Sequence, residues 1–367
     1  MRIIASGDYH LSLREPYGIM RAEGINTRLQ DKLDAISQIV DYAVKNKADL
    51  FITVGDEMDQ LNPPEILRYK FIEVMSPLFH AGIPWRLIMG NHTYNNIYYN
   101  FQGEEKLLTL IGQTDFKIIS EPTIEDFKGE PLKDTRDSKG IPLSYLPWCY
   151  IKDAETFLKA NPNRIVFGHL PIKGALLNDY EVRSKEGLNN ISNQRFIFMG
   201  HYHKYQSSNN WCYVGSPIRC DFSERNQEKG FLDIQVETNG LDYTFIEIKD
   251  RDFLQLEFSE PSDPMEYINN MTDIDGAIVK VKLSGTNPWI YSVNKTEVVK
   301  TLELKKALKV LSPEIEVLEN KKKKFTMSKD STFSDNIHTY CKEKKRLEVE
   351  DQMQEMLSDT VNNMKEL

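Results

Sequence analysis

The sequence has few cysteines and no apolar run long enough to span a membrane. Its 4 cysteines are scattered without Cys-x-x-Cys spacing, which argues against a zinc knuckle and against a disulfide framework. An apolar strand begins at residue 2, which leaves no room for a signal peptide. We therefore expect a reduced, cytoplasmic protein that does not associate with membranes.

Basic residues are not in excess either, because the formal net charge is −9 over 367 residues. Broad, non-specific coating of nucleic acid needs a basic surface, so this composition argues against that function. It does not exclude a nuclease, since bound metal ions supply positive charge at a scissile phosphate. The chain is longer than a single hydrophobic core usually stabilises, which predicts two domains and a tail.

The most informative stretch is residues 83–92. Residues 83–89 are mostly apolar and too few for a helix, which favours a buried strand. Gly90 lets the backbone turn or approach a ligand closely. Asn91 and His92 then follow at a strand end, where ligands of open α/β sheets collect. Taken alone, this tripeptide is more typical of a tight turn with a surface histidine.

The rest of the chain predicts an α/β protein. Strands at 2–7 and 49–54 alternate with helices at 26–46 and after Pro63, which indicates βαβ units and a parallel sheet. Residues 120–143 are expected to form a loop or hairpin insertion. Further strands are predicted at 164–167, 196–199, 211–214, 231–236 and 243–248. The predicted organisation is a domain at 1–250, a small α/β domain at 251–320, a linker at 321–334 and an amphipathic helical segment at 335–367.

Several strand ends carry carboxylate, imidazole or amide side chains. These donors suit Mn²⁺, Fe²⁺ or Zn²⁺ better than a soft metal. They are too many for one ion but suit two, provided that one carboxylate bridges, and two bound ions can share a hydroxide nucleophile. Each motif alone has a simpler explanation, such as a helix cap for Asp56. Their recurrence on separate strand ends makes coincidence improbable. The set is Asp8, His10, Asp56, Asn91, His92, His169, His201 and His203.

These motifs resemble the five signature blocks of the calcineurin-like metallophosphoesterases. Within that superfamily the sequence is similar to the SbcD family of recombination nucleases. It is most similar to the smaller version encoded by tailed phages, the recombination endonuclease subunit. The closer similarity rests on residues 213–217, 222–224 and 229–231. The five blocks are Asp8-x-His10, Gly55-Asp56-x-x-Asp59, Gly90-Asn91-His92, Gly168-His169 and Gly200-His201-x-His203.

The resemblance implies a sandwich of two β-sheets flanked by helices, followed by a cap that engages DNA. It also implies Mn²⁺ as the preferred metal, and His92 as the group that protonates or stabilises the leaving oxygen. Its ligand assignment places Asp8, His10 and His203 on one ion, Asn91, His169 and His201 on the other, and Asp56 between them.

The resemblance further implies partners. Members of the family act on double-stranded DNA ends, and they pair as a homodimer within a heterotetramer that contains an SbcC-type coiled-coil ATPase. The segment 335–367 fits the part that docks on this ATPase. If the protein is encoded by a phage, its compartment would be the host cytoplasm. Tyr94, Asn95 and Asn96 lie in an aromatic and amide-rich loop, for which DNA contact and packing at a dimer surface both remain open.

The sequence departs from the family pattern near the predicted site. Thr93 stands where the family usually has an aspartate that orients His92, unless Asp59 substitutes for it. Glu57 replaces a residue that is usually apolar. Two alternatives to a DNA nuclease therefore remain: a phosphomonoesterase or cyclic-nucleotide phosphodiesterase with the same site, and a degenerate fold that serves as a non-catalytic assembly platform.

Overall fold

The computed structural model describes residues 1–22, 24–92, 115–127, 140–177, 180–183, 186–189, 191–237, 240–318, 332–343 and 353. The chain divides into two compact units. One comprises Met1–Phe258, Ser262–Leu283 and Val293–Glu314, and the other comprises Ser259–Pro261, Ser284–Ser292 and Ile315–Leu367. Within the described residues, no helix combines the length and the apolar character that crossing a membrane requires.

The first six-stranded sheet has the order β14-β13-β1-β2-β3-β4. Strands β1, β2 and β3 run parallel, as the alternation of strands and helices predicts. Strand β4 adds a further parallel strand beside β3, and β13 pairs antiparallel with β1. The strands are β1 (Arg2–Ser6), β2 (Leu50–Thr53), β3 (Trp85–Ile88), β4 (Phe116–Ile119), β13 (Gly230–Val236) and β14 (Leu241–Glu247).

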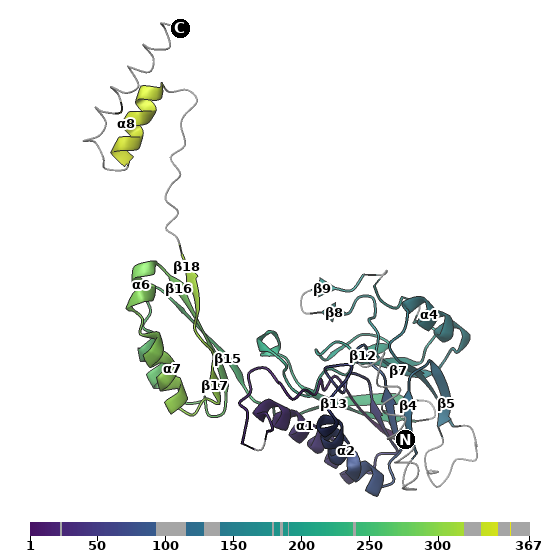
Figure 1. Ribbon diagram of the computed structural model, residues 1–367. Helices are drawn as coiled ribbons and strands as arrows, with labels where there is room; N and C mark the ends of the chain where they lie inside the picture. The colour runs from purple at the N-terminus through teal and green to yellow at the C-terminus, as the bar shows by residue number, and fades with distance from the viewer. Residues whose placement is uncertain are drawn as a thin grey trace. The chain divides into compact units, whose positions relative to one another are not determined.

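Helices α1 (Thr27–Lys45) and α2 (Glu65–His80) cover the outer face of this sheet (Figure 1). The Asn26 side chain caps α1 by accepting a hydrogen bond from the backbone N–H of Arg28. Apolar residues at helical spacing then face the strands, as the sequence predicts. The resulting core includes Leu33, Ile36, Phe51, Phe71 and Trp85.

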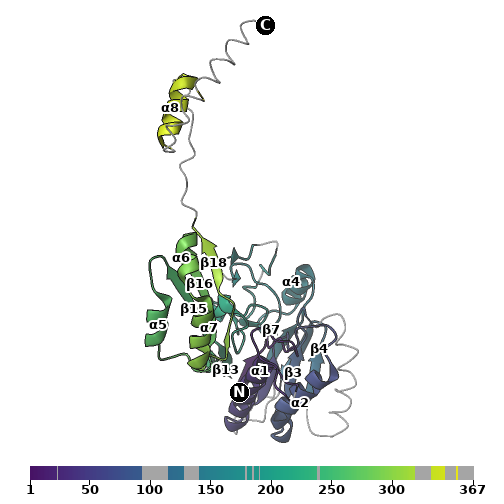
Figure 2. The same cartoon turned by 60° about the vertical axis from the view of Figure 1, so that its left-hand side comes forward.

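The second six-stranded sheet has the order β11-β12-β10-β7-β6-β5. The segment 120–143 enters it as an antiparallel pair, β5 and β6, which is the hairpin form of the predicted insertion. Helix α4 (Ile151–Ala160) covers its outer face (Figure 2). The strands are β5 (Thr123–Phe127), β6 (Ile141–Leu146), β7 (Ile165–Gly168), β10 (Phe196–Met199), β11 (Gln206–Ser207) and β12 (Trp211–Tyr213).

The two sheets face each other across a buried core that includes Ile52, Val54, Phe167, Phe198 and Leu232. The architecture is therefore a sandwich of two mixed sheets with helices outside, which confirms this part of the predicted fold. A short hairpin of β8 (Leu176–Leu177) and β9 (Tyr180–Glu181) and a 3₁₀ helix, η1 (Phe222–Glu224), lie in the connections.

After residue 251 the chain forms a four-stranded sheet. Strands β15, β16 and β17 are adjacent in that order, and β18 pairs with β16. The cap function, the predicted boundaries and the docking segment stay predictions. Residues 321–331 of the predicted linker at 321–334 lie outside the described residues. The elements are β15 (Phe253–Ser259), α5 (Pro264–Asn270), β16 (Ile278–Gly285), α6 (Asn287–Ser292), α7 (Lys295–Leu304), β17 (Lys309–Val310), β18 (Glu314–Val317) and α8 (Phe333–Glu343).

Candidate metal centre

The predicted ligands follow five parallel strands at one edge of the sandwich. Strands β1, β2 and β3 are neighbours in the first sheet, and β7 and β10 are neighbours in the second. Because the carboxyl ends of neighbouring parallel strands lie together, the side chains that follow them converge. All seven predicted ligands lie in this group: Asp8, His10, Asp56, Asn91, His169, His201 and His203.

The converging side chains form two clusters that share Asp56 as a neighbour. The ligand atoms of Asp8, His10 and His203 lie within 4.8 Å of one another, and so do those of Asp56, His169 and His201. Oδ2 of Asp56 is 3.1 Å from Nε2 of His169 and 3.8 Å from Nε2 of His10. This carboxylate therefore lies between the two clusters, where a bridging ligand is required.

Asn91 completes the second cluster. Its Oδ1 atom lies 3.1 Å from Nε2 of His169 and 2.9 Å from Nδ1 of His201. Nδ1 of His169 donates a hydrogen bond to the Val54 carbonyl at 2.7 Å, which leaves the lone pair of the neutral ring on Nε2. That lone pair faces the oxygens of Asp56 and Asn91, which also carry lone pairs. The resulting repulsion is relieved when a proton or a metal cation lies between these atoms.

The donor atoms fit divalent metal ions. Nε2 of His10 and Nε2 of His203 lie 3.0 Å apart. Two imidazole nitrogens bound at about 2.0–2.1 Å to one zinc-sized ion are themselves separated by about 3–3.5 Å. Carboxylate, imidazole and amide donors without thiolate match the chemistry of Mn²⁺, Fe²⁺ or Zn²⁺. The residues present can therefore hold two ions.

Burial and neighbouring charges in the second cluster shift the pKa values of His169 and His201 in opposite directions. Burial alone would lower the pKa of His169, but the Asp56 carboxylate outweighs it and raises the pKa to about 9. Although burial disfavours its charge, the pKa of Asp56 lies below its usual range because His169 and His10 are close. Burial and the neighbouring His169 lower the pKa of His201 to about 3, which keeps this ring neutral and able to coordinate.

The backbone is strained at four of the candidate ligands. Asp8, His10, Asp56 and His201 have φ values of 53°, 45°, 50° and 91°. Such left-handed conformations are uncommon for residues other than glycine, and they gather at functional sites. Backbone N–H groups also hold the carboxylates: that of His201 donates to both oxygens of Asp8 at 3.0 and 3.1 Å, and that of His92 donates to Asp56 at 3.0 Å.

Two glycines provide the space that these carboxylate and imidazole groups occupy. A Cβ atom on Gly90 would lie 2.1 Å from Oδ1 of Asp56. A Cβ atom on Gly55, which has a φ of 101°, would lie 2.3 Å from Nδ1 of His169. The close approach that the sequence predicts for Gly90 is therefore an approach to the bridging candidate.

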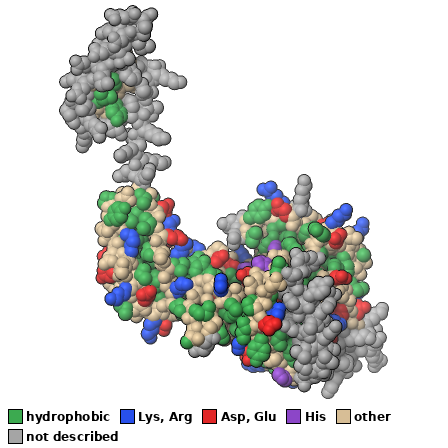
Figure 3. Space-filling model, in the orientation of Figure 1, with side chains coloured by type: hydrophobic (Ala, Val, Ile, Leu, Met, Phe, Trp, Pro, Cys, Tyr) green, Lys and Arg blue, Asp and Glu red, His purple; other side chains and the backbone are tan. Residues whose placement is uncertain are grey.

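His92 lies beside the clusters, and its side chain is 38% exposed. Its Nδ1 atom is 3.1 Å from the Asp59 carbonyl oxygen and 3.6 Å from Asp59 Oδ1. Asp59 thus places a carboxylate beside His92, and its substitution for the aspartate that Thr93 replaces stays a prediction. Thr93 itself lies outside the described residues, as do Tyr94, Asn95 and Asn96. Figure 3 shows histidine side chains that reach the molecular surface.

Three further residues belong to this region, and the sequence motifs assign them no role. The Trp148 ring lies 5.2 Å from that of His201, and its position after the parallel strand β6 is the signal that could have identified it. Oε1 of Glu224 lies 2.7 Å from Nδ1 of His203. Glu57 is buried, and its burial raises the pKa of the carboxyl to about 8.

A family model, calcineurin-like phosphoesterase, matches residues 1–205, which is more than half of the chain. The chain belongs to this family. The match confirms the predicted family, and the phosphoesterase fold and the histidine and aspartate clusters together point to divalent metal ions.

Three curated relatives show a distant similarity to this chain. The phosphoesterase is 25% identical over 251 residues to "Exonuclease subunit 1" of Enterobacteria phage T4, covering 66% of this chain and 67% of that one. It is 26% identical over 289 residues to a subunit of the SbcCD nuclease of Staphylococcus epidermidis, covering 68% and 70%. It is 24% identical over 313 residues to "DNA double-strand break repair protein Mre11" of Methanosarcina acetivorans, covering 81% of this chain and 48% of that one.

The chain thus spans about half the length of the Mre11 relative that it matches. These identities establish a distant relation to SbcD and Mre11 nucleases and to a protein of a tailed phage, as the sequence motifs predict.

Proposed function

We propose that this phosphoesterase is a Mn²⁺-dependent DNA nuclease that hydrolyses phosphodiester bonds as an exonuclease and endonuclease. The observation that supports it most is the position of Asp56, whose Oδ2 atom lies between two ligand clusters that each combine residues from both sheets. The names of the matched relatives favour DNA as the substrate class.

In this proposal, Asp8, His10 and His203 would hold one ion, Asn91, His169 and His201 would hold the other, and Asp56 would be a ligand common to the two. When bound, the two ions would supply Lewis acidity at the phosphate and lower the pKa of an attacking water. The chain's own contribution is the fixed geometry of these donors, since backbone N–H groups orient Asp8 and Asp56 before any substrate arrives.

His92 would then deliver a proton to the leaving oxygen. Its Nδ1 atom is engaged by the Asp59 carbonyl, which leaves Nε2 as the ring nitrogen available to a substrate. The partial exposure of the side chain is consistent with this role, because a proton donor has to reach a bound DNA strand.

The activity test compares linear duplex DNA with a chromogenic phosphate ester, both with Mn²⁺. Cleavage of DNA in preference to the ester supports the nuclease. Preference for the ester or for a cyclic nucleotide would instead indicate a small-substrate phosphoesterase of the same family. Absence of both activities in a protein that binds Mn²⁺ would favour the assembly platform.

For partners, we propose that residues 335–367 dock on an SbcC-type coiled-coil ATPase and that the protein forms a homodimer within a heterotetramer. Support comes from the relative that is named as one component of the SbcCD nuclease and from helix α8 at the start of this segment. Deletion of residues 330–367 should abolish association with the ATPase on size-exclusion chromatography and leave Mn²⁺ binding intact. An unchanged complex would contradict this assignment.

A further inference from the structure

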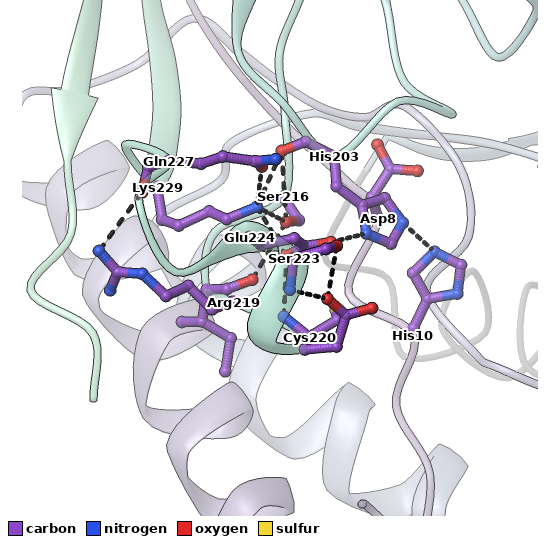
Figure 4. Close-up of polar contacts among 12 residues, drawn as sticks. Asp8, His10, His203, Ser216, Arg219, Cys220, Ser223, Glu224, Gln227 and Lys229 are labelled. Carbon is purple, nitrogen blue, oxygen red and sulfur yellow. Dashed lines mark hydrogen bonds and ion pairs between the residues drawn. The ribbon is translucent and has the colours of Figure 1, made fainter. Parts of the chain in front are cut away.

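We propose that Glu224 is a positioning residue that holds His203 with Nε2 directed at the first metal ion. The proposal rests on the metal centre described above and adds to it a residue that does not itself bind the ion. Figure 4 shows the arrangement, with Glu224 and His10 on opposite sides of the His203 ring.

The imidazole of His203 uses its two nitrogens in different directions. Nδ1 lies 2.7 Å from Oε1 of Glu224, so it donates a hydrogen bond to the carboxylate. Nε2 lies 3.0 Å from Nε2 of His10, in the cluster that also contains Asp8. Because the proton resides on Nδ1, the lone pair of the neutral ring is on Nε2, the nitrogen that faces the other candidate ligands.

Glu224 is itself fixed by its surroundings. Its second oxygen, Oε2, accepts a hydrogen bond from the backbone N–H of Cys220 at 2.8 Å and contacts Nζ of Lys229 at 2.8 Å. The residue ends the 3₁₀ helix η1, whose first turn is capped by Asp221 through the backbone N–H of Ser223 at 2.7 Å. A carboxylate held from both sides can set the orientation of the ring it contacts.

Lys229 connects the Glu224 carboxylate to the backbone of His203. Its Nζ atom also lies 2.8 Å from Oγ of Ser216, 3.1 Å from Oε1 of Gln227 and 3.0 Å from the carbonyl oxygen of His203. The side chain of Lys229 is 1% exposed, and a buried ammonium is costly unless oxygens surround it. This ion pair adds no net charge beside the metal centre while it holds both the ring and the main chain of His203.

The same contacts argue that Glu224 does not itself bind a metal ion together with His203 and Cys220. Atoms of His203, Cys220 and Glu224 lie within 4.8 Å of one another, which would allow a separate ion. However, Oε1 of Glu224 is occupied by the imidazole, and Oε2 is occupied by an N–H group and an ammonium. A cation there would have to displace Lys229, so the contacts favour a role through His203.

The test uses full-length protein and measures Mn²⁺ binding by isothermal titration calorimetry. Glu224→Ala should weaken one of the two Mn²⁺ sites by about 10–100-fold while a total of two ions still binds at high concentration. A double variant, Glu224→Leu with Lys229→Met, removes both buried charges together, so it should fold even if Glu224→Ala does not. Glu228→Ala, which removes an exposed carboxylate of the same loop, is the control and should bind as wild type.

A spectroscopic readout separates positioning from a general loss of structure. In the diamagnetic Zn²⁺-loaded protein, the Nδ1 proton of His203 should give a downfield resonance in proton NMR, protected from exchange by Glu224. The resonance should disappear in both Glu224 variants and persist in Glu228→Ala. A folded Glu224 variant that keeps the resonance or binds both Mn²⁺ ions with wild-type affinity would overturn the proposal.

The outcome also distinguishes this inference from the function on which it rests. If wild-type protein does not bind two Mn²⁺ ions, the proposed metal centre is wrong and the role of Glu224 falls with it. If wild type binds two ions and the folded double variant binds them equally well, only the role of Glu224 is wrong.

Discussion

Nε2 of His10 and Nε2 of His203 lie 3.0 Å apart, although 193 positions separate the two residues in the chain. The first follows a strand of one sheet, and the second follows a strand of the other. Two imidazole lone pairs at this distance repel each other unless a cation or a proton lies between them. This contact therefore indicates that the two sheets bring metal-binding side chains together.

The proposed proton donor can be tested separately from the ligands. His92→Ala should lower the kcat for DNA cleavage by about 10²–10⁴-fold, because a general acid contributes about that much. Mn²⁺ binding should persist, since the other donors are unchanged. The measurement pairs single-turnover cleavage with calorimetry, and His80→Ala, at an exposed position of α2, is the matched control. Unchanged cleavage by a Mn²⁺-loaded His92→Ala protein would contradict the assignment.

Metal binding should depend on pH through His169. The Asp56 carboxylate overcomes the effect of burial and raises the pKa of His169 from 6.5 to about 9. A raised pKa in the folded state means that protonation stabilises the metal-free fold below about pH 6.5, and that this contribution is lost as the pH rises toward 9.

Because a metal binds the neutral ring, the apparent Mn²⁺ affinity should rise over the same pH range, with protons released on binding. Anaerobic calorimetry in buffers of different ionisation enthalpy measures both quantities. A flat affinity without proton release would show that His169 does not coordinate.

Space beside Asp56 should limit what can replace Gly90. In Gly90→Ala, the added Cβ would lie 2.1 Å from Oδ1 and 2.6 Å from the backbone nitrogen of Asp56, so both the carboxylate and the main chain have to move. We expect weaker Mn²⁺ binding together with a lower free energy of unfolding. Gly240→Ala is the control, because its Cβ would find its nearest neighbour, Glu237, at 4.0 Å. Equal Mn²⁺ affinity in the two variants would contradict the expected displacement.

A stability prediction concerns the buried Arg86 on β3. Its guanidinium makes two hydrogen bonds to the Glu125 carboxylate, at 2.8 and 2.9 Å, and thereby joins the two sheets. Arg86→Ala removes one partner and leaves a partly buried carboxylate, so it should lower the free energy of unfolding by about 3–5 kcal/mol. Lys117→Ala, which removes the half-exposed partner of Glu125, should cost less than about 1 kcal/mol. Urea denaturation measures both, and similar costs would contradict this explanation.

Much of the site follows from local sequence because each ligand motif is attached to its own strand end. The apolar spacing after Asn26 also predicts α1, and Gly90 predicts the close approach at β3. Strand β4 and helix α4 have no such signal, and local pattern does not say which strands share a sheet. That partition depends on contacts between distant segments, such as the core between Ile52 and Phe167.

The supporting residues were harder to predict for the same reason. Glu224 lies in the short 3₁₀ helix η1, and its role depends on His203, 21 positions earlier in the chain. Asp59 is part of a recognisable block, but its proximity to both His10 and His92 is visible only in three dimensions. A motif identifies residue types, whereas the tautomer and orientation of an imidazole depend on what folds against it.

The most direct measurement is anomalous scattering from a crystal soaked in Mn²⁺. Two peaks should flank the Asp56 carboxylate at a separation of about 3.5–4 Å, one near His10 and His203 and the other near His169 and His201. A single peak, or none beside Asp56, would contradict the two-metal centre.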